Sequence, residues 1–177
     1  MAQAVVCIVM GSANDWSIMQ GAAEILARFD IPYEVTVSSA HRAPQRTAAL
    51  AQEAGQRGVQ VIIAGAGGAA HLAGVIAAET TLPVIGVPLD SSPLKGLDAL
   101  LATVQMPQGV PVATVAIGKT GAANAGILAA QIVALHNAAL AARLRQYKAE
   151  LAAGVERAAE ILQTQLQAQH HDTSARR

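Results

Sequence analysis

Three short segments of the sequence carry residue types that suit the binding of a phosphate group. They are Gly11-Ser12-Ala13-Asn14-Asp15, Ser38-Ser39-Ala40-His41-Arg42-Ala43-Pro44 and Gly65-Ala66-Gly67-Gly68-Ala69-Ala70-His71. Glycines such as Gly11 and Gly67 let backbone N–H groups approach a ligand that a side chain would block. Ser12 and Ser39 offer hydroxyl donors at expected helix entrances, where the helix dipole favours an anion. The planar, permanently charged guanidinium of Arg42 matches a phosphate, so the segments predict a monophosphate site.

His41 is the candidate for proton transfer, because imidazole side chains take up and release protons near neutral pH. It lies directly beside the predicted phosphate-binding residues. A structural or phosphate-binding histidine is the alternative. His71, at the end of the third segment, could line the same pocket or orient a backbone carbonyl. Asp15 is placed to accept hydrogen bonds from ribose hydroxyls.

The same residues also have plainer interpretations. Ser12, Asn14 or Asp15 could simply cap a helix. Ser39 and Arg42 could be a cap and a surface charge. A binding site is favoured because all three segments follow predicted strands and all carry small or anion-binding groups.

Short apolar runs alternate along the chain with stretches of helical period. The apolar runs predict strands at 4–10, 31–38, 60–66, 82–87 and 112–117. The helical period predicts helices at 15–29, 44–56, 71–80, 95–104, 121–151 and 155–167. This alternation indicates an α/β fold with a parallel sheet covered by helices on both faces. The flavodoxin-like strand order 2-1-3-4-5 is expected, and it brings the three segments together at the carboxyl ends of neighbouring strands.

The C-terminal part is expected to belong to the same domain, over residues 1–168, with a polar tail at 169–177. The predicted helix 121–151 is apolar on more than one side, which a neighbouring subunit could bury, so we expect a homo-oligomer. His136, inside this helix, is expected to be interfacial or exposed. His170 and His171 belong to the tail, and we do not expect them to bind a metal.

Composition excludes several classes of function. Twelve basic residues balance twelve acidic ones among 177, so no overall field attracts nucleic acid or an anionic membrane. Cys7 is the only cysteine, which excludes an internal disulfide, and its apolar surroundings predict an inert core thiol. The chain start resembles neither a signal peptide nor a membrane span. We therefore expect a soluble, cytoplasmic protein.

Four motifs, in order along the chain, carry a family resemblance. They are Gly11-Ser12-x-x-Asp15-Trp16, Ser39-Ala40-His41-Arg42, Ile63-Ala64-Gly65-Ala66-Gly67-Gly68-Ala69-Ala70-His71-Leu72 and Gln105-Met106-Pro107-x-Gly109-x-Pro111-Val112. Together they resemble the N5-carboxyaminoimidazole ribonucleotide mutases of de novo purine synthesis, from about Val5 to Ala149. The departures are Ala73, where proline is usual, and Ala43, where threonine is common, and neither removes a needed chemical group.

The resemblance implies a flavodoxin-like three-layer sandwich, a homo-octamer, and no metal or organic cofactor. It also implies a carboxylate shift from an exocyclic amine to an imidazole ring carbon, with carbon dioxide as a transient intermediate. In that reaction His41 would act first as general acid and then as general base. The substrate would be bound by Gly11, Ser12, Asp15, Ser39, Arg42, Ala66, Gly67 and His71.

Two other functions compete with this interpretation. A sister group carboxylates the aminoimidazole ribonucleotide directly with carbon dioxide, but it tends to carry lysine after the histidine, where this chain has Arg42. A non-catalytic flavin- or nucleotide-binding module of flavodoxin type is the second alternative. Flavin carriers usually stack the ring on aromatic side chains, and aromatics are only 2% of this chain.

Overall fold

A computed structural model describes the backbone of residues 3–175 and the side chains of residues 3–167. The chain divides into two compact units, Met1–Asn137 and Ala138–Arg177. The first holds the sheet and the predicted site residues, and the second is helical. Among the described residues, none of the helices combines the length and the apolar character that crossing a membrane requires.

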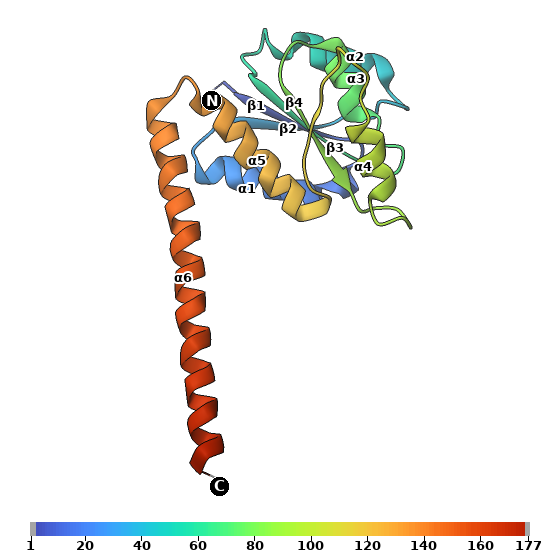
Figure 1. Cartoon of the computed structure of the whole chain (residues 1–177). Helices are drawn as coiled ribbons and strands as arrows, with labels where there is room; N and C mark the ends of the chain where they lie inside the picture. The colour runs from blue at the N-terminus through green and yellow to red at the C-terminus, as the bar shows by residue number, and fades with distance from the viewer. Residues whose placement is uncertain (1–2, 176–177) are drawn as a thin grey trace. The chain divides into compact units, whose positions relative to one another are not determined.

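The first unit is built around a parallel sheet of five strands in the order β2-β1-β3-β4-β5 (Figure 1). The strands are β1 (Val6–Met10), β2 (Tyr33–Val37), β3 (Val61–Gly67), β4 (Val84–Leu89) and β5 (Ala113–Thr114). Strands β1 and β4 are buried along their whole length, as expected of apolar strands covered on both faces. The flavodoxin-like fold predicted from the sequence is therefore confirmed.

Helices cover both faces of this sheet. In the first unit they are η1 (Ala13–Asp15), α1 (Trp16–Arg28), α2 (Pro44–Ala54), α3 (Leu72–Glu79), α4 (Leu97–Val104) and α5 (Gly118–Ala134). Helices α1 and α5 pack against each other on one side of the sheet, and α2 and α3 lie together on the other (Figure 1). Right-handed crossovers explain the division. The chain moves in one direction along the sheet from β1 to β2 and in the opposite direction from β2 to β3 and β4, so α1 lies on one face and α2 and α3 on the other.

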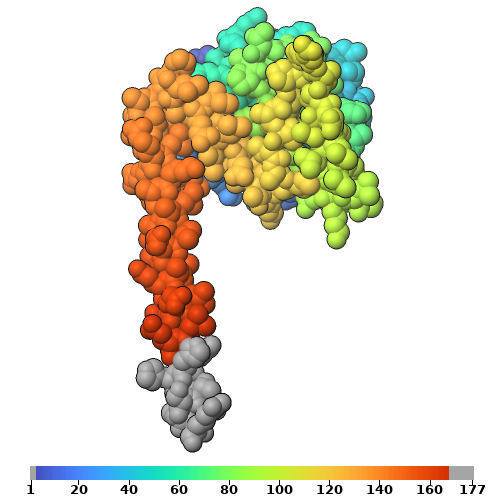
Figure 2. Space-filling model, in the orientation of Figure 1, coloured from blue at the N-terminus to red at the C-terminus, as the bar shows by residue number. Residues whose placement is uncertain are grey.

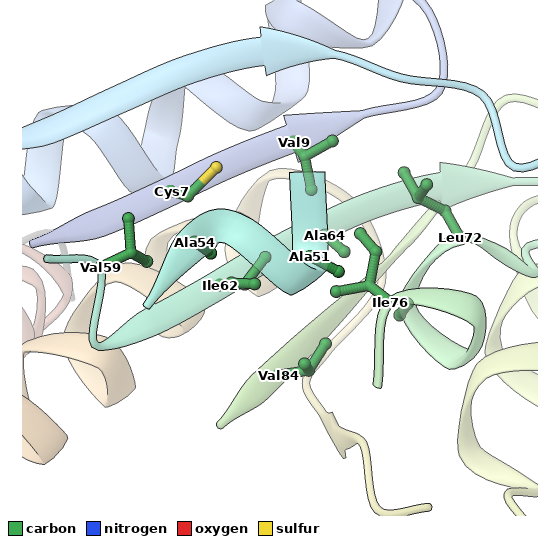
Figure 3. Close-up of a cluster of buried hydrophobic side chains, with 11 residues drawn as sticks. Cys7, Val9, Ala51, Ala54, Val59, Ile62, Ala64, Leu72, Ile76 and Val84 are labelled. Atoms are coloured by element: carbon green, nitrogen blue, oxygen red, sulfur yellow. The ribbon is translucent and has the colours of Figure 1, made fainter. Parts of the chain in front are cut away.

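Small and β-branched side chains fill the space between the sheet and helices α2 and α3 (Figure 3). Alanines such as Ala51 and Ala54 bring α2 close to the strands, where they meet Cys7 and Ile62. Burial, followed by the nearby Glu34, raises the pKa of the Cys7 thiol to about 12. A thiol with so high a pKa carries almost no thiolate at neutral pH, in agreement with the predicted inert role.

The C-terminal helices differ from the prediction at two points. Helix α5 ends at Ala134, and α6 (Ala138–Ala175) then runs without a break (Figure 1). In Figure 2 the described part of α6, in orange to red, forms one narrow rod. The predicted helix 121–151 was wrong because the chain turns at 135–137, where backbone N–H groups donate to carbonyls three residues back. His136 lies exposed in this turn.

The predicted break near Gly154 is absent. One glycine costs a helix interior only about 0.5–1 kcal/mol relative to alanine, which a long helix tolerates. The helical backbone also continues over the predicted polar tail as far as Ala175. The side chains of His170 and His171, and residues 176–177 altogether, lie outside the described part of the chain.

Candidate functional site

A pocket of about 360 Å³ opens where the strands of the first unit end. It is lined by all the residues predicted for the site, namely Gly11, Ser12, Asp15, Ser39, His41, Arg42, Ala66, Gly67 and His71. Ala40, Ala69, Leu72 and Ser91 complete the lining. The first three belong to the predicted segments and motifs but were not named as site residues, whereas Ser91 lies outside all of them. The topology explains the convergence, because the loops after β1, β2, β3 and β4 meet at one edge of a parallel sheet.

The segment after β1 enters the pocket through a short capped turn. The Ser12 hydroxyl accepts the N–H of Asn14 at 3.3 Å, and the Asp15 carboxylate accepts the N–H of Ser12 at 3.0 Å. These reciprocal bonds form a capping box at the start of η1. The capping interpretation of Ser12 and Asp15 is thus correct, and both residues also line the pocket.

The carboxyl group of Asp15 is held in an unfavourable environment for its charge. Burial raises its pKa above the ordinary value, and the hydrogen bond from the Ser12 N–H opposes that rise without cancelling it. A carboxylate that is partly desolvated gains more from a ligand's hydroxyl donors than one already solvated by water. This suits Asp15 to accept hydrogen bonds from hydroxyl groups of a ligand.

The raised pKa predicts a pH-dependent effect of Asp15→Asn in the protein without ligand. At pH values between the pKa of Asp15 in the unfolded chain and its raised pKa in the folded chain, the folded state binds more protons than the unfolded state. The free energy of unfolding of the parent protein therefore falls as the pH rises through this interval. Asparagine does not ionise, so the variant lacks this pH dependence. Its amide oxygen can still accept the hydrogen bond from the Ser12 N–H. At pH 7 its Tm should therefore lie slightly above that of the parent.

Thermal unfolding across pH tests this expectation. The Tm difference between Asp15→Asn and parent should disappear at acid pH, below both pKa values, where the parent carboxyl is protonated in both states. A difference that stays constant across the whole pH range would contradict the assignment to Asp15 ionisation.

The segment after β2 forms a turn that positions Arg42. The backbone N–H and the Nε–H of Arg42 donate to the Ser39 hydroxyl at 3.3 and 3.5 Å, and Arg42 Nη2 donates to the Gly11 carbonyl at 3.3 Å. Helix α2 begins only at Pro44, with Ala43 as its N-cap, so Ser39 does not lie at a helix entrance as expected. The Ser39 hydroxyl holds the arginine instead, and the guanidinium lies between the ends of β1 and β2.

The two pocket histidines contact each other directly. His41 Nε2 lies 2.7 Å from His71 Nδ1, and the rings are nearly perpendicular, at 85°. A hydrogen bond between two imidazoles requires a proton on one nitrogen and a lone pair on the other. While it is formed, the two rings therefore share one proton across this contact. His71 is the N-cap residue of α3, so the helix fixes the position from which it reaches His41.

The end of β3 forms the remaining wall of the pocket. Ala66 and Gly67 pair with Pro88 and Leu89 of β4, and a Cβ on Gly67 would overlap the hydroxyl of Ser91. The Ser91 hydroxyl thus occupies the space beside Gly67 that a side chain at this position would take. Ser91 was missed in the sequence because Asp90-Ser91-Ser92-Pro93 looks like an ordinary turn.

These features define a flavodoxin-like α/β protein with a pocket at the carboxyl edge of its sheet, lined by an arginine and two histidines. The sequence model of the AIR carboxylase family matches residues 5–154. The chain therefore belongs to the AIR carboxylase family. The family resemblance recognised in the sequence motifs is confirmed.

Individual relatives agree with this assignment. The N5-carboxyaminoimidazole ribonucleotide mutase of Aliivibrio fischeri is 57% identical over 143 residues, covering 81% of this chain and 89% of that protein. The mutase of Escherichia coli K12 is 56% identical, with coverages of 81% and 85%. The crystal structure of Treponema denticola PurE superposes with a TM-score of 0.77 at 26% identity, covering 85% of this chain and 92% of that one.

Proposed function

We propose that the chain catalyses the reaction for which these mutases are named. It would move the carboxylate of N5-carboxyaminoimidazole ribonucleotide from the exocyclic amine to the imidazole ring carbon, giving 4-carboxy-5-aminoimidazole ribonucleotide. The observation that carries the proposal is the convergence of His41, His71 and Arg42 on one pocket in a chain 57% identical to such a mutase.

The pocket offers a place for each part of the substrate. Arg42 and the Ser12 and Ser39 hydroxyls surround the end near β1 and β2, where they would hold the phosphate. The Asp15 carboxylate would accept the ribose hydroxyls. The imidazole would then lie beside His41 and His71, with Gly67 in the wall behind it, since all three residues line the same pocket.

His41 would act twice in one turnover. As the bond between the exocyclic nitrogen and the carboxyl carbon breaks, protonated His41 gives its proton to that nitrogen, and carbon dioxide leaves. The ring carbon of the aminoimidazole ribonucleotide then attacks carbon dioxide and forms the new carbon–carbon bond. Neutral His41 removes the ring proton, which restores aromaticity and returns the histidine to its starting state.

His71 supports this double role through its 2.7 Å contact with His41. The contact fixes the direction of the His41 ring and gives its proton a neighbouring site. Carbon dioxide must stay in the pocket between the two steps, so we propose that the enzyme works with water largely excluded. We further propose that it works in the cytoplasm as a homo-octamer and without a metal or organic cofactor.

Substrate choice distinguishes the mutase from direct carboxylation, the activity that the family's own description names. Purified protein would receive N5-carboxyaminoimidazole ribonucleotide, or separately aminoimidazole ribonucleotide with bicarbonate. We expect efficient formation of 4-carboxy-5-aminoimidazole ribonucleotide from the first. Efficient turnover of the second alone would overturn the proposal and assign the chain to direct carboxylation.

A further inference from the structure

Ser91 is a pocket residue to which the proposed mechanism gives no role. It lies two residues beyond Leu89, the last residue of β4, and is exposed to the pocket. Within the part of the chain whose side chains are described, its hydroxyl makes no hydrogen bond to another residue. A hydroxyl that faces a pocket without a protein partner is available to a ligand.

Strand order places Ser91 far from the phosphate-binding residues. Arg42 follows β2 and Ser12 follows β1, whereas Ser91 follows β4, with β3 between. Neighbouring strands lie about 4.8 Å apart, so the ends of β1 and β4 are separated by roughly 10 Å. A ribonucleotide whose phosphate lies at Arg42 and Ser12 would therefore direct its imidazole toward Ser91.

The absence of a side chain at Gly67 makes room for the Ser91 hydroxyl. A Cβ on residue 67 would overlap this oxygen, so the hydroxyl occupies the space that glycine leaves beside the β3 backbone. Leu89 pairs with Gly67 in the sheet, which fixes the segment carrying Ser91 against the end of β3. The sheet thus places a residue with a hydroxyl donor in the wall of the pocket.

The geometry points to Ser91 as the donor that binds the carboxylate of the carboxylated imidazole, an inference that rests on the proposed function. A carboxylate accepts hydrogen bonds only, and a serine hydroxyl can donate one. This bond would hold the new carboxylate in the orientation reached when the ring carbon attacks. Ser91 would thereby favour recarboxylation over loss of carbon dioxide, without taking part in any proton transfer.

Ser91→Ala and its neighbour Ser92→Ala form a matched pair for the test. The Ser92 hydroxyl donates to the Asp98 carboxylate at 2.9 Å and accepts the N–H of Leu94 at 3.2 Å, and Ser92 does not line the pocket. Calorimetry would measure binding of 4-carboxy-5-aminoimidazole ribonucleotide and of aminoimidazole ribonucleotide, which lacks the carboxylate. Ser91→Ala should weaken binding of the carboxylated ligand about 10-fold and leave the other unchanged.

Turnover gives a second readout. During conversion of N5-carboxyaminoimidazole ribonucleotide, Ser91→Ala should release a larger fraction of the substrate as decarboxylated aminoimidazole ribonucleotide than the parent does. For Ser92→Ala this fraction should equal that of the parent. If Ser91→Ala weakened the binding of both ligands equally, or weakened the binding of neither, the proposed role of Ser91 would be wrong. If the parent protein binds neither ligand, the proposed function fails, and the inference about Ser91 fails with it.

Discussion

Replacing His41 with asparagine should lower kcat by about 10²–10⁴-fold, the usual range for removal of a general acid or base. Asparagine keeps a polar side chain that can hydrogen bond, but it cannot take up or release a proton. The proposed reaction needs protonation of the exocyclic nitrogen and later removal of the ring proton. Both steps use His41, so the loss should fall on kcat with little change in substrate binding.

Two measurements separate a chemical defect from a structural one. His41 is exposed and its substitution removes one exposed hydrogen bond, to His71, so the free energy of unfolding of His41→Asn should lie within about 1 kcal/mol of the parent value. Binding of 4-carboxy-5-aminoimidazole ribonucleotide, measured by calorimetry, should stay within a few-fold of the parent value. A variant that keeps most of its kcat would exclude His41 as the group that transfers the proton.

The site was predictable because its chemistry follows strands that could be recognised. Ser12, Ser39 and His71 are far apart in the sequence, but each comes soon after an apolar run. The strand order then brought the three loops to one edge of the sheet. Residue type and topology together were enough to find the pocket, without any knowledge of side-chain conformation.

The interactions within the pocket were not predictable from the same information. The contact between His41 and His71 depends on the conformations of two side chains thirty residues apart. The position of Ser91 depends on the register of β3 with β4 and on the missing side chain of Gly67. Apolar patterns predict which strands form, but they carry no information on such side-chain contacts.

The helix boundaries show a similar limit. Alanine-rich sequence on both sides of 135–137 gives one continuous helical pattern, and Asn137 alone indicates an end. Gly154 gives a stronger sequence signal for a break, yet α6 continues through it. Local preferences of about 1 kcal/mol are too small to decide such boundaries, because the backbone hydrogen bonds of the surrounding turns outweigh them.

Arg42→Ala should weaken binding of 4-carboxy-5-aminoimidazole ribonucleotide by about 1.5–3 kcal/mol, the value of a hydrogen bond to a charged group. This corresponds to a roughly 10- to 150-fold rise in Kd. The guanidinium already lies between the Ser39 hydroxyl and the Gly11 carbonyl, so it needs little reorganisation to bind a phosphate there. Arg42→Lys keeps the charge but loses the planar guanidinium, so its Kd should lie between that of the parent and that of Arg42→Ala.

Arg46→Ala is the matched control for this variant. Arg46 lies four residues further along the chain and donates to the Thr36 hydroxyl at 3.4 Å, in a groove separate from the pocket. Its removal changes net charge equally but should leave Kd within about 2-fold, because exposed charges at a distance are screened by salt. The nucleoside without its phosphate provides the second control, since Arg42→Ala should not change its affinity. If Arg42→Ala and Arg46→Ala weaken nucleotide binding equally, the phosphate is attracted by overall charge, and the site assigned to Arg42 is wrong.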